Sequence, residues 1–549
     1  MATRFQTQVL VIGAGPVGLT LAMDLAQRGV QVLVAETRHR GEPPSVKCNH
    51  VSARTMEIFR SLGIVRQVRD TGLPADYPND VSYRTTFTGQ EISRIPIPSR
   101  QHRYTDKAGP DGWWPTPEPP HRINQIYLEP VLFSCAEATR GVTILSRTRI
   151  DDWEQHADGV RAFGTNLDTG EHVSVESAFV IGCEGGRSLT RKNIGAAFEG
   201  DAEIGRVQST FIRAPDLYAR AKAPPAWGTF SLNPRRSGNV YAIDGRETFL
   251  VHNYLRPHEK DFEAVDRDWA IRTILGTGDD FRFEILAKED WIARRLVADR
   301  FRDRRAFICG DSAHLWVPMA GYGMNAGIAD AMNLSWTLAA SLGGWGAEGI
   351  LDAYQAERLP ITDQVSRFAM GHAIALQKER EGVQAHLEDP GPEGEQARRA
   401  AGKAQYDLNV RQYCCGGLNF GTFYDRSPLI AYDGEAQPVF GMDTFTPSTV
   451  PGCRTPHVWL DDGRSLYDAM GRGYTLLRFD ASLPTAPLEE AATRAGVPLT
   501  VLDVRSREAE GLYRHKLVLS RPDQHVAWRG DAVPADARAL VDRIRGAGG

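Results

Sequence analysis

The chain has 549 residues, more than one ordinary hydrophobic core supports, so two or three domains are expected. Its 64 Lys and Arg against 69 Asp and Glu give a net charge of -5, so we expect neither a nucleic acid nor a membrane as partner. The seven cysteines are scattered and odd in number, which favours reduced thiols over disulfides or a zinc site. Because neither a signal-peptide pattern nor an apolar run of about 18 residues occurs, we expect a cytoplasmic protein.

The first forty residues alternate between apolar strands and an amphipathic helix. Residues 8–12 are an apolar run that ends on the letters GAGPVG, and residues 17–27 have helical spacing. A second apolar strand, residues 30–35, ends at Glu36. This order of strand, glycine turn, helix, strand and carboxylate predicts a dinucleotide-binding fold.

Each glycine of the turn has a separate expected role. Gly13 permits the tight turn, Gly15 lets backbone N–H groups approach a pyrophosphate, and Gly18 lets the helix pack closely on the strand. Glu36 is placed to accept hydrogen bonds from a ribose, which favours FAD or NAD over a cofactor with a 2′-phosphate. The turn by itself does not separate FAD from NAD.

A later segment, residues 306–338, supplies that distinction. It reads AFICGDSAHLWVPMAGYGMNAGIADAMNLSWTL and resembles the signature of the single-component flavoprotein aromatic hydroxylases, or class A flavin monooxygenases. Val317 and Tyr322 replace the more usual Pro and Gln of that signature, and a helix is expected from about Met324. The resemblance implies FAD-binding roles for Gly310, Asp311, Gly321, Gly323, Met324 and Asn325.

Three shorter segments extend the resemblance. Residues 49–64 predict a helix in which Arg54 corresponds to an arginine near the flavin and its phosphates, and Gln125 corresponds to a flavin-contacting glutamine. Residues 178–195 resemble the family's Asp-Gly motif, with Glu184 in the place of the usual Asp. No second glycine fingerprint occurs, which fits a family whose NAD(P)H donor docks transiently.

The predicted fold class is α/β: a Rossmann-like FAD-binding domain, an antiparallel β-sheet substrate domain and a C-terminal thioredoxin-like domain. The tail predicts strands over 474–479 and 499–504, helices over 488–495 and 535–544, and a hairpin of 516–519 with 526–528. It lacks CxxC, so a packing or dimer role is expected. Residues 377–403 are predicted to form a polar helix and loop that link domains. The expected divisions are FAD-binding 1–80, 122–193 and 299–400 (with connecting helices), substrate domain 81–121 and 194–298, linker 401–445, and thioredoxin-like 446–549.

The resemblance implies that NAD(P)H reduces FAD and that O2 then forms a C4a-hydroperoxide, which hydroxylates a phenolic ring. Ring hydroxylation needs a group that accepts the phenol proton, and His50 is the leading candidate because its ordinary pKa lies near 6.5. Asn49 and Tyr322 are candidate substrate or flavin contacts. A Baeyer–Villiger or epoxidising oxygenase, and a flavin-binding protein without oxygenase activity, stay open as alternatives, and a homodimer is possible.

Overall fold

The computed structural model describes residues 3–42, 44–318 and 321–548. Its central sheet has the order β17-β18-β10-β2-β3-β6, in which all strands except β17 run parallel. The bounds are β2 Val9–Ile12, β3 Val32–Ala35, β6 Val142–Leu145, β10 Phe179–Gly182, β17 Arg302–Asp303 and β18 Ala306–Ile308.

The central strands are short apolar runs with α1 and α4 packed against them. Every residue of β2, β3, β10 and β18 is buried, as expected for a parallel sheet. Helices α1 (Pro16–Gln27) and α8 (Tyr322–Leu342) pack against each other beside the sheet, and α1 also contacts α4 (Gln125–Ala138). The strand–turn–helix–strand order predicted for the N-terminus is confirmed.

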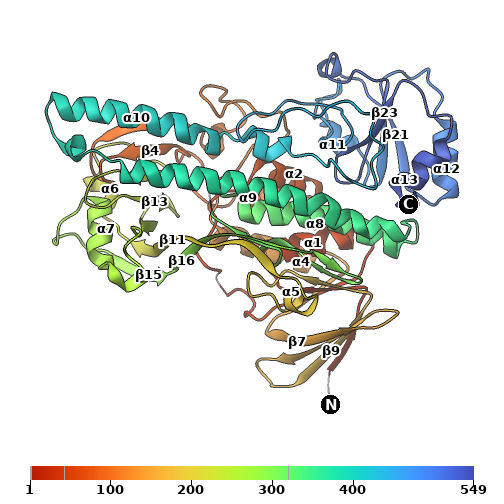
Figure 1. The fold of residues 1–549 in the computed structure, drawn as a ribbon, viewed down its shortest axis with the longest axis horizontal. Coiled ribbons are helices and arrows are strands. Elements are labelled where there is room, and N and C mark those ends of the chain that lie inside the picture. Colours follow the sequence, from red (N-terminus) through yellow and green to blue (C-terminus); the bar gives the residue numbers. More distant parts are fainter. Residues whose placement is uncertain (1–2, 43, 319–320, 549) are drawn as a thin grey trace.

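A small second sheet lies at the end of the molecule where the chain begins (Figure 1). It has the order β1-β9-β8-β7, an antiparallel meander to which β1 adds in parallel. Its strands are β1 Thr3–Gln6, β7 Thr148–Gln155, β8 Val160–Asn166 and β9 His172–Ser177.

The large sheet has the order β19-β16-β11-β14-β13-β12-β4-β5, with β15 paired to β11. Most neighbours are antiparallel, as predicted for residues 194–298, although β4 and β12 run parallel. The bounds are β4 Val81–Arg84, β5 Glu91–Ile95, β11 Phe198–Arg213, β12 Gly228–Ser231, β13 Gly238–Ala242, β14 Thr248–Tyr254, β15 Glu284–Lys288, β16 Trp291–Ala298 and β19 His314–Trp316.

Different layers cover the two faces of the large sheet. Helix α7 (Arg267–Leu275) buries Ile271 and Ile274 against Phe249 and Val251 of β14 on one face, near the short helix α6 (Leu217–Arg220). Two long helices, α9 (Asp352–Glu381) and α10 (Pro392–Tyr413), run along the other side (Figure 1). Because side chains alternate along a strand, Leu250 and His252 of β14 point to the opposite face from Phe249 and Val251.

Helix α10 occupies part of the segment predicted as a link. It continues past residue 400, where the sequence suggests a division, and it packs on β5. Ala397 and Tyr413 of α10 belong to the same buried cluster as Trp227. Most polar side chains of this segment lie on the exposed face of α10, while a few apolar side chains pack against the sheet.

The C-terminal unit contains each element predicted for it. Its sheet has the order β21-β20-β22-β23, in which β20 and β21 are parallel and the other pairs antiparallel. The bounds are α11 Leu466–Ala469, β20 Tyr474–Arg478, α12 Ala486–Arg494, β21 Leu499–Asp503, β22 Leu517–Ser520, β23 Val526–Gly530 and α13 Ala537–Ile544. The mixed α/β fold class is confirmed, while the thioredoxin-like classification stays a prediction.

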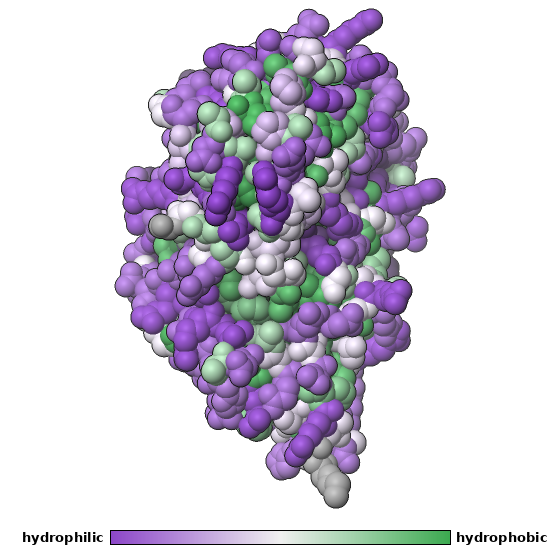
Figure 2. Space-filling model, turned by 90° about the vertical axis from the view of Figure 1, so that its right-hand side faces the viewer, coloured by the Kyte–Doolittle hydropathy of each residue, from purple (hydrophilic) through white to green (hydrophobic). Residues whose placement is uncertain are grey.

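The side of the molecule drawn in Figure 2 is largely hydrophilic, with hydrophobic atoms visible in smaller areas between the charged ones. Within the described residues, none of the helices combines the length and the apolar character needed to cross a bilayer.

Candidate functional site

The glycine turn after β2 is shaped by close backbone contacts. Gly13 has a φ of 106°, and a Cβ there would lie 2.5 Å from the carbonyl oxygen of Cys183. A Cβ on Gly18 would lie 2.1 Å from the carbonyl oxygen of Gly13. Gly15, which precedes α1, has open space around it. The structure thus requires glycine at 13 and 18 and leaves room for a ligand at 15.

Glu36 directly follows β3 beside this turn. It accepts hydrogen bonds from the backbone N–H of Ala14 (2.8 Å) and of Arg38 (2.9 Å). Burial raises the pKa of Glu36, but the Arg38 guanidinium and these N–H groups outweigh it, so the pKa is lowered and the group is a carboxylate. Arg38, which sequence reasoning missed, also pairs with Glu129 at 2.8 Å.

The Gly310–Asp311 turn meets α1 and α8 through small residues. A Cβ on Gly310, whose φ is 59°, would lie 3.0 Å from Val17 and 3.6 Å from the Cα of Gly327. Asp311 is exposed, yet surrounding protein raises the pKa of its carboxyl by desolvation, while His314 and Lys47 act in the opposite direction. The Lys47 charge beside Asp311 was not predicted.

A buried carboxylate holds this turn in place. Asp330 of α8 accepts from His314 Nε2 at 2.7 Å, from Arg358 Nε at 2.8 Å and from the Gly310 N–H at 3.3 Å. Burial raises the pKa of Asp330, but Arg358 and His314 lower it further, so that it stays charged. The turn that carries Asp311 is therefore anchored to both α8 and α9.

The start of α8 is tied to the segment that carries His50. Gly321, with a φ of 65°, precedes the helix, which begins at Tyr322, two residues before the predicted start. Asn325 donates to the carbonyl oxygens of His50 (3.1 Å) and Gly321 (2.6 Å) and accepts from the Ser52 N–H (2.9 Å). Asn325 thus positions two loops relative to each other. Met319 and Ala320 of the predicted flavin loop lie outside the described residues.

The other residues predicted in this loop lie close by. Gly323 is near Trp316, whose Nε1 would be 3.3 Å from a Cβ at that position. Met324 is half-buried against the main core. Tyr322 is buried in a cluster that also contains Val365. Its ring therefore faces α9 and the segment after α10.

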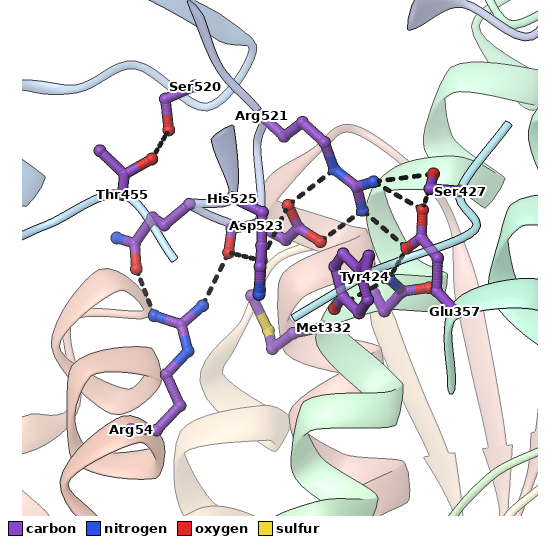
Figure 3. A network of polar contacts seen from close by, with 12 residues as sticks. Arg54, Met332, Glu357, Tyr424, Ser427, Thr455, Ser520, Arg521, Asp523 and His525 are labelled. Atoms are coloured by element: carbon purple, nitrogen blue, oxygen red, sulfur yellow. Dashed lines mark hydrogen bonds and ion pairs between the residues drawn. The ribbon is translucent and has the colours of Figure 1, made fainter. Parts of the chain in front are cut away.

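Arg54 lies at the contact between α2 and the C-terminal unit. It lies in α2 (Ala53–Ser61) and donates to Glu57 at 3.0 Å and to Gln524. It also donates to the Asp523 carbonyl oxygen at 2.8 Å (Figure 3). Its guanidinium points to the C-terminal unit, because Asp523 and Gln524 of that unit accept from it. The sequence alone could not show this contact, which spans more than 400 residues.

Figure 3 shows a wider network at this interface. Arg521 of the C-terminal unit donates to Glu357 of α9 at 2.6 and 2.8 Å and to Asp523 at 3.0 and 2.6 Å. A cavity of about 60 Å³ lies between this network and α2, α8 and α9. Arg54, Tyr322, Asn325, Arg358 and His525 are among its lining residues.

Gln125 begins α4 next to the segment that carries His50. Its backbone N–H donates to the carbonyl oxygens of Cys48 (3.0 Å) and Lys47 (3.3 Å), and its side chain donates to Glu129. Asn49 accepts from the side chain of Asn124. The residues predicted at positions 49, 50 and 125 are thus brought together.

His50 is buried and paired with an arginine that sequence reasoning missed. Its Nδ1 lies 2.6 Å from Arg122 Nη1. Because a guanidinium keeps its protons, Arg122 is the donor, so His50 carries its proton on Nε2. Burial, together with the charges of Arg122 and Arg103, holds the pKa of His50 well below its ordinary value, so the ring is neutral.

Aromatic rings of the large sheet continue from this pair. The Arg122 guanidinium lies 4.3 Å from the ring centroid of Trp227, which lies 5.1 Å from Tyr241. Next along the sheet, the rings of Tyr241 and His252 are 5.5 Å apart, and those of His252 and Trp291 are 6.0 Å apart. We call these five residues, Arg122, Trp227, Tyr241, His252 and Trp291, the aromatic wall. Its rings lie in a row on one face of the sheet, where an aromatic ligand would find partners for ring–ring contacts.

The residues present fit FAD. Gly15 leaves space at the start of α1 for a pyrophosphate, and Glu36 is an acceptor for a ribose. Asp311 is an exposed carboxylate and Lys47 supplies a nearby cation. These groups come from four separate segments. Three of them follow the carboxyl ends of β2, β3 and β18, which lie at the same edge of the central sheet.

Comparisons with known proteins agree with this fit. Residues 6–369 match the family described as FAD binding domain, and residues 448–548 match aromatic-ring hydroxylase, C-terminal. The chain is 30% identical to the FAD-dependent monooxygenase apdD of Emericella nidulans, covering 98% of this chain and 89% of that protein. It is 28% identical to a phenol 2-monooxygenase of a Pseudomonas species, covering 98% and 93%.

Solved structures resemble the whole chain. The rebeccamycin biosynthetic enzyme RebC with reduced flavin superposes with a TM-score of 0.89 at 33% identity, covering 99% of this chain and all of that one. Aklavinone-11 hydroxylase with FAD and aklavinone gives a TM-score of 0.79 at 25% identity, covering 98% of each chain. The chain belongs to the family of FAD-dependent aromatic-ring hydroxylases, and it is an FAD-dependent aromatic monooxygenase.

Proposed function

We propose that this enzyme hydroxylates a phenolic or polyketide-like aromatic ring with NAD(P)H as electron donor and O2 as oxidant. The observation that carries the proposal is the aromatic wall, which stands beside His50 and the loop tied to it by Asn325. The names of relatives agree, since they include 2,4-dichlorophenol 6-monooxygenase and tetracenomycin B2 monooxygenase-dioxygenase.

FAD supplies the electron transfer and oxygen activation when bound. The chain's own residues bind and orient it and position the substrate. The proposed FAD-binding residues are Gly13, Gly15, Gly18, Glu36, Arg54, Gln125, Gly310, Asp311, Gly321, Gly323, Met324 and Asn325, with Arg38 and Lys47 added by the structure.

On the substrate side we propose His50 as the residue that contacts the ring hydroxyl, with Asn49 beside it. In the arrangement described here the Nδ1 lone pair of His50 is taken by Arg122, so His50 offers its Nε2–H as a donor. Proton abstraction by His50 would require that this hydrogen bond be released. Tyr322, buried toward α9, is proposed to support the loop.

The reaction is tested with the purified flavoprotein under anaerobic conditions. NADPH or NADH is mixed with the enzyme, with and without phenol, 2,4-dichlorophenol or 1,8-dihydroxyanthraquinone, and flavin bleaching is followed. We expect one of the aromatic compounds to accelerate reduction, and aerobic turnover to yield a product with one added oxygen. NMR of the product separates ring hydroxylation from ring expansion or epoxidation. Substrate-independent reduction that yields only hydrogen peroxide would contradict the proposal.

The role of His50 is tested with His50→Ala and His50→Gln in the FAD-loaded enzyme. We expect His50→Ala to slow hydroxylation by roughly 10²-fold or more while flavin reduction changes little, because loss of one positioned hydrogen-bond donor costs a rate factor on that scale. His50→Gln keeps a hydrogen-bonding side chain and should recover part of the rate. Unchanged turnover in His50→Ala would remove the residue from the mechanism.

A further inference from the structure

Arg122 is a buried cation whose hydrogen-bonding capacity is largely unused. Its side chain is 5% exposed, and a guanidinium has five N–H donors. Among the described residues, only His50 accepts from it, and no carboxylate lies within ion-pair distance. Four of the five donors therefore remain available to a ligand.

Other buried arginines in the described part of the chain are supplied with acceptors. Arg521 and Arg358 each contact a buried carboxylate directly. Arg191 makes no ion pair among the described residues, but it donates to the carbonyl oxygens of Gly186 and Ser312. Arg122 has neither arrangement, although an unpaired buried charge is costly.

The charges around Arg122 do not balance. Arg103 pairs with the nearby Asp111, and its own Nε and Nη2 are buried without an acceptor. Burial lowers the pKa of His50 and of His121, so both rings are neutral, and it raises the pKa values of Tyr413, Cys414 and Cys415, so these stay protonated. Two guanidinium groups thus face one carboxylate.

The orientation of Arg122 is fixed by aromatic rings. Its guanidinium lies 4.3 Å from the Trp227 centroid and 5.6 Å from that of Tyr413, while Nη1 holds His50. Such a cation is held in place before any ligand arrives, and a planar guanidinium suits the two oxygens of a carboxylate.

We infer that Arg122 is the anion-binding residue of the substrate site, and that this enzyme takes aromatic substrates which carry an anionic oxygen, a carboxylate or an ionised ring hydroxyl. The inference rests on the proposed function, because it assumes that the aromatic wall holds the substrate ring. The substrate would then bring the counter-charge that the protein lacks, and His50 would lie next to it.

The test measures binding without turnover, so that it does not depend on hydroxylation. Three probes share one ring system: anthraquinone-2-carboxylate, 2-hydroxyanthraquinone and the neutral anthraquinone-2-carboxamide. Their dissociation constants are measured from the change in the flavin spectrum of the oxidised holoenzyme. We expect the wild type to bind the carboxylate or the hydroxyl probe at least tenfold more tightly than the carboxamide.

The Arg122→Met variant should lose this preference and leave carboxamide binding within about twofold, while Arg122→Lys should keep part of it. Loss confined to the carboxylate probe identifies an acid substrate, and loss confined to the hydroxyl probe identifies a ring oxygen. Arg40→Met, which changes an exposed arginine paired with Glu137, is the matched control and should change nothing.

Three outcomes overturn the inference. The first is that the wild-type enzyme binds neither anionic probe more tightly than the carboxamide. This result needs only the wild type, so it counts even if Arg122→Met does not fold. The second is an equal loss of all three probes in Arg122→Met. The third is a variant with unchanged probe binding but a shifted flavin reduction potential, which would assign Arg122 to the cofactor. A failure to hydroxylate any phenol leaves these binding results intact and counts only against the proposed function.

Discussion

Helix α8 makes two very different contacts on its two sides. On the side of the Gly310 turn and α1, the backbones come close together because glycines have no side chain. A Cβ on Gly327 would lie 2.8 Å from the Cα of Gly310. Toward α9 and the C-terminal unit the contact is made by charged side chains, with Asn333 of α8 donating to Glu357, which binds Arg521. The first contact depends on backbone shape, and the second on pairing between distant residues.

This difference governs how each contact fails. A backbone contact made by glycine tolerates no added atom, but it leaves no charge behind when it is altered. A buried ion network tolerates small shifts, but removal of one member leaves an uncompensated charge. We therefore expect larger losses of stability from the network than from the glycine contacts.

The largest effect is expected from Arg521→Met. This change leaves Glu357 and Asp523 buried without their cation, which costs about 3–5 kcal/mol in the free energy of unfolding. Thermal and denaturant unfolding of the FAD-loaded protein measure it. Arg40→Met, at an exposed pair, is the control and should leave the unfolding midpoint unchanged. Equal midpoints for the two variants would contradict the view that the network holds the C-terminal unit.

A smaller loss is expected from Gly18→Ala, and it should differ in kind from that of Gly15→Ala. The added Cβ at 18 collides with the Gly13 carbonyl and should cost about 1–3 kcal/mol even without FAD. The Cβ at 15 meets open space, so the apoprotein should be as stable as the wild type while FAD binding weakens by tenfold or more. Apoprotein melting and FAD titration separate the two effects. Similar melting of both apoproteins would show that the turn is not as tight as described.

Acid should weaken the ion pairs that Glu57 makes with Arg54 and Arg454 beside this network before it affects the glycine contacts. Burial raises the pKa of Glu57, but Arg454 and Arg54 outweigh it, so the folded pKa lies below the ordinary value of 4.5. A depressed carboxyl pKa contributes stability that is present above the unfolded value and is lost as the pH falls through the folded value. Between about pH 5 and pH 3 the free energy of unfolding should fall less steeply in Glu57→Gln than in the wild type. Parallel curves would mean that Glu57 is not held ionised by the two arginines.

The smallest effect is expected from Glu36→Gln. The amide oxygen is a weaker acceptor for a ribose hydroxyl than a carboxylate, and the amide is no longer held by the charge of Arg38. FAD affinity should therefore fall by about tenfold, or about 1.4 kcal/mol. Stability of the apoprotein should change by less than FAD affinity does. Titration of apoprotein with FAD measures the first and thermal melting the second. A variant with wild-type FAD affinity would place the ribose elsewhere.

The sequence predicts best where function is built from local backbone geometry. The strand, turn and helix around Gly13 and Gly18 lie within twenty residues, so their spacing alone indicates the fold. Arg54 and Arg122 show the opposite case. Their partners, Asp523 and Trp227, are far away in the chain, and no local pattern encodes such pairings. No local signal pointed to the contact of Arg54 with Asp523 or to a role for Arg122.

His50 lies between these two cases. Its position ahead of α2 was predicted, while its tautomer follows from Arg122, seventy-two residues later. A homodimer, the cytoplasmic location, the thioredoxin-like class of the tail and the exact domain divisions stay predictions.

Helix α9, with 30 residues and a length of about 45 Å, contacts the C-terminal unit, the FAD-binding part and the large sheet. Glu357 binds the C-terminal unit, Arg358 holds the carboxylate behind the Gly310 turn, and Arg380 lies 3.8 Å over the Tyr254 ring of the large sheet. A change to any one of these three contact sites therefore requires a matching change on one stretch of this helix. An engineer who grafts a new substrate sheet onto this scaffold should transplant the matching length of α9 with it.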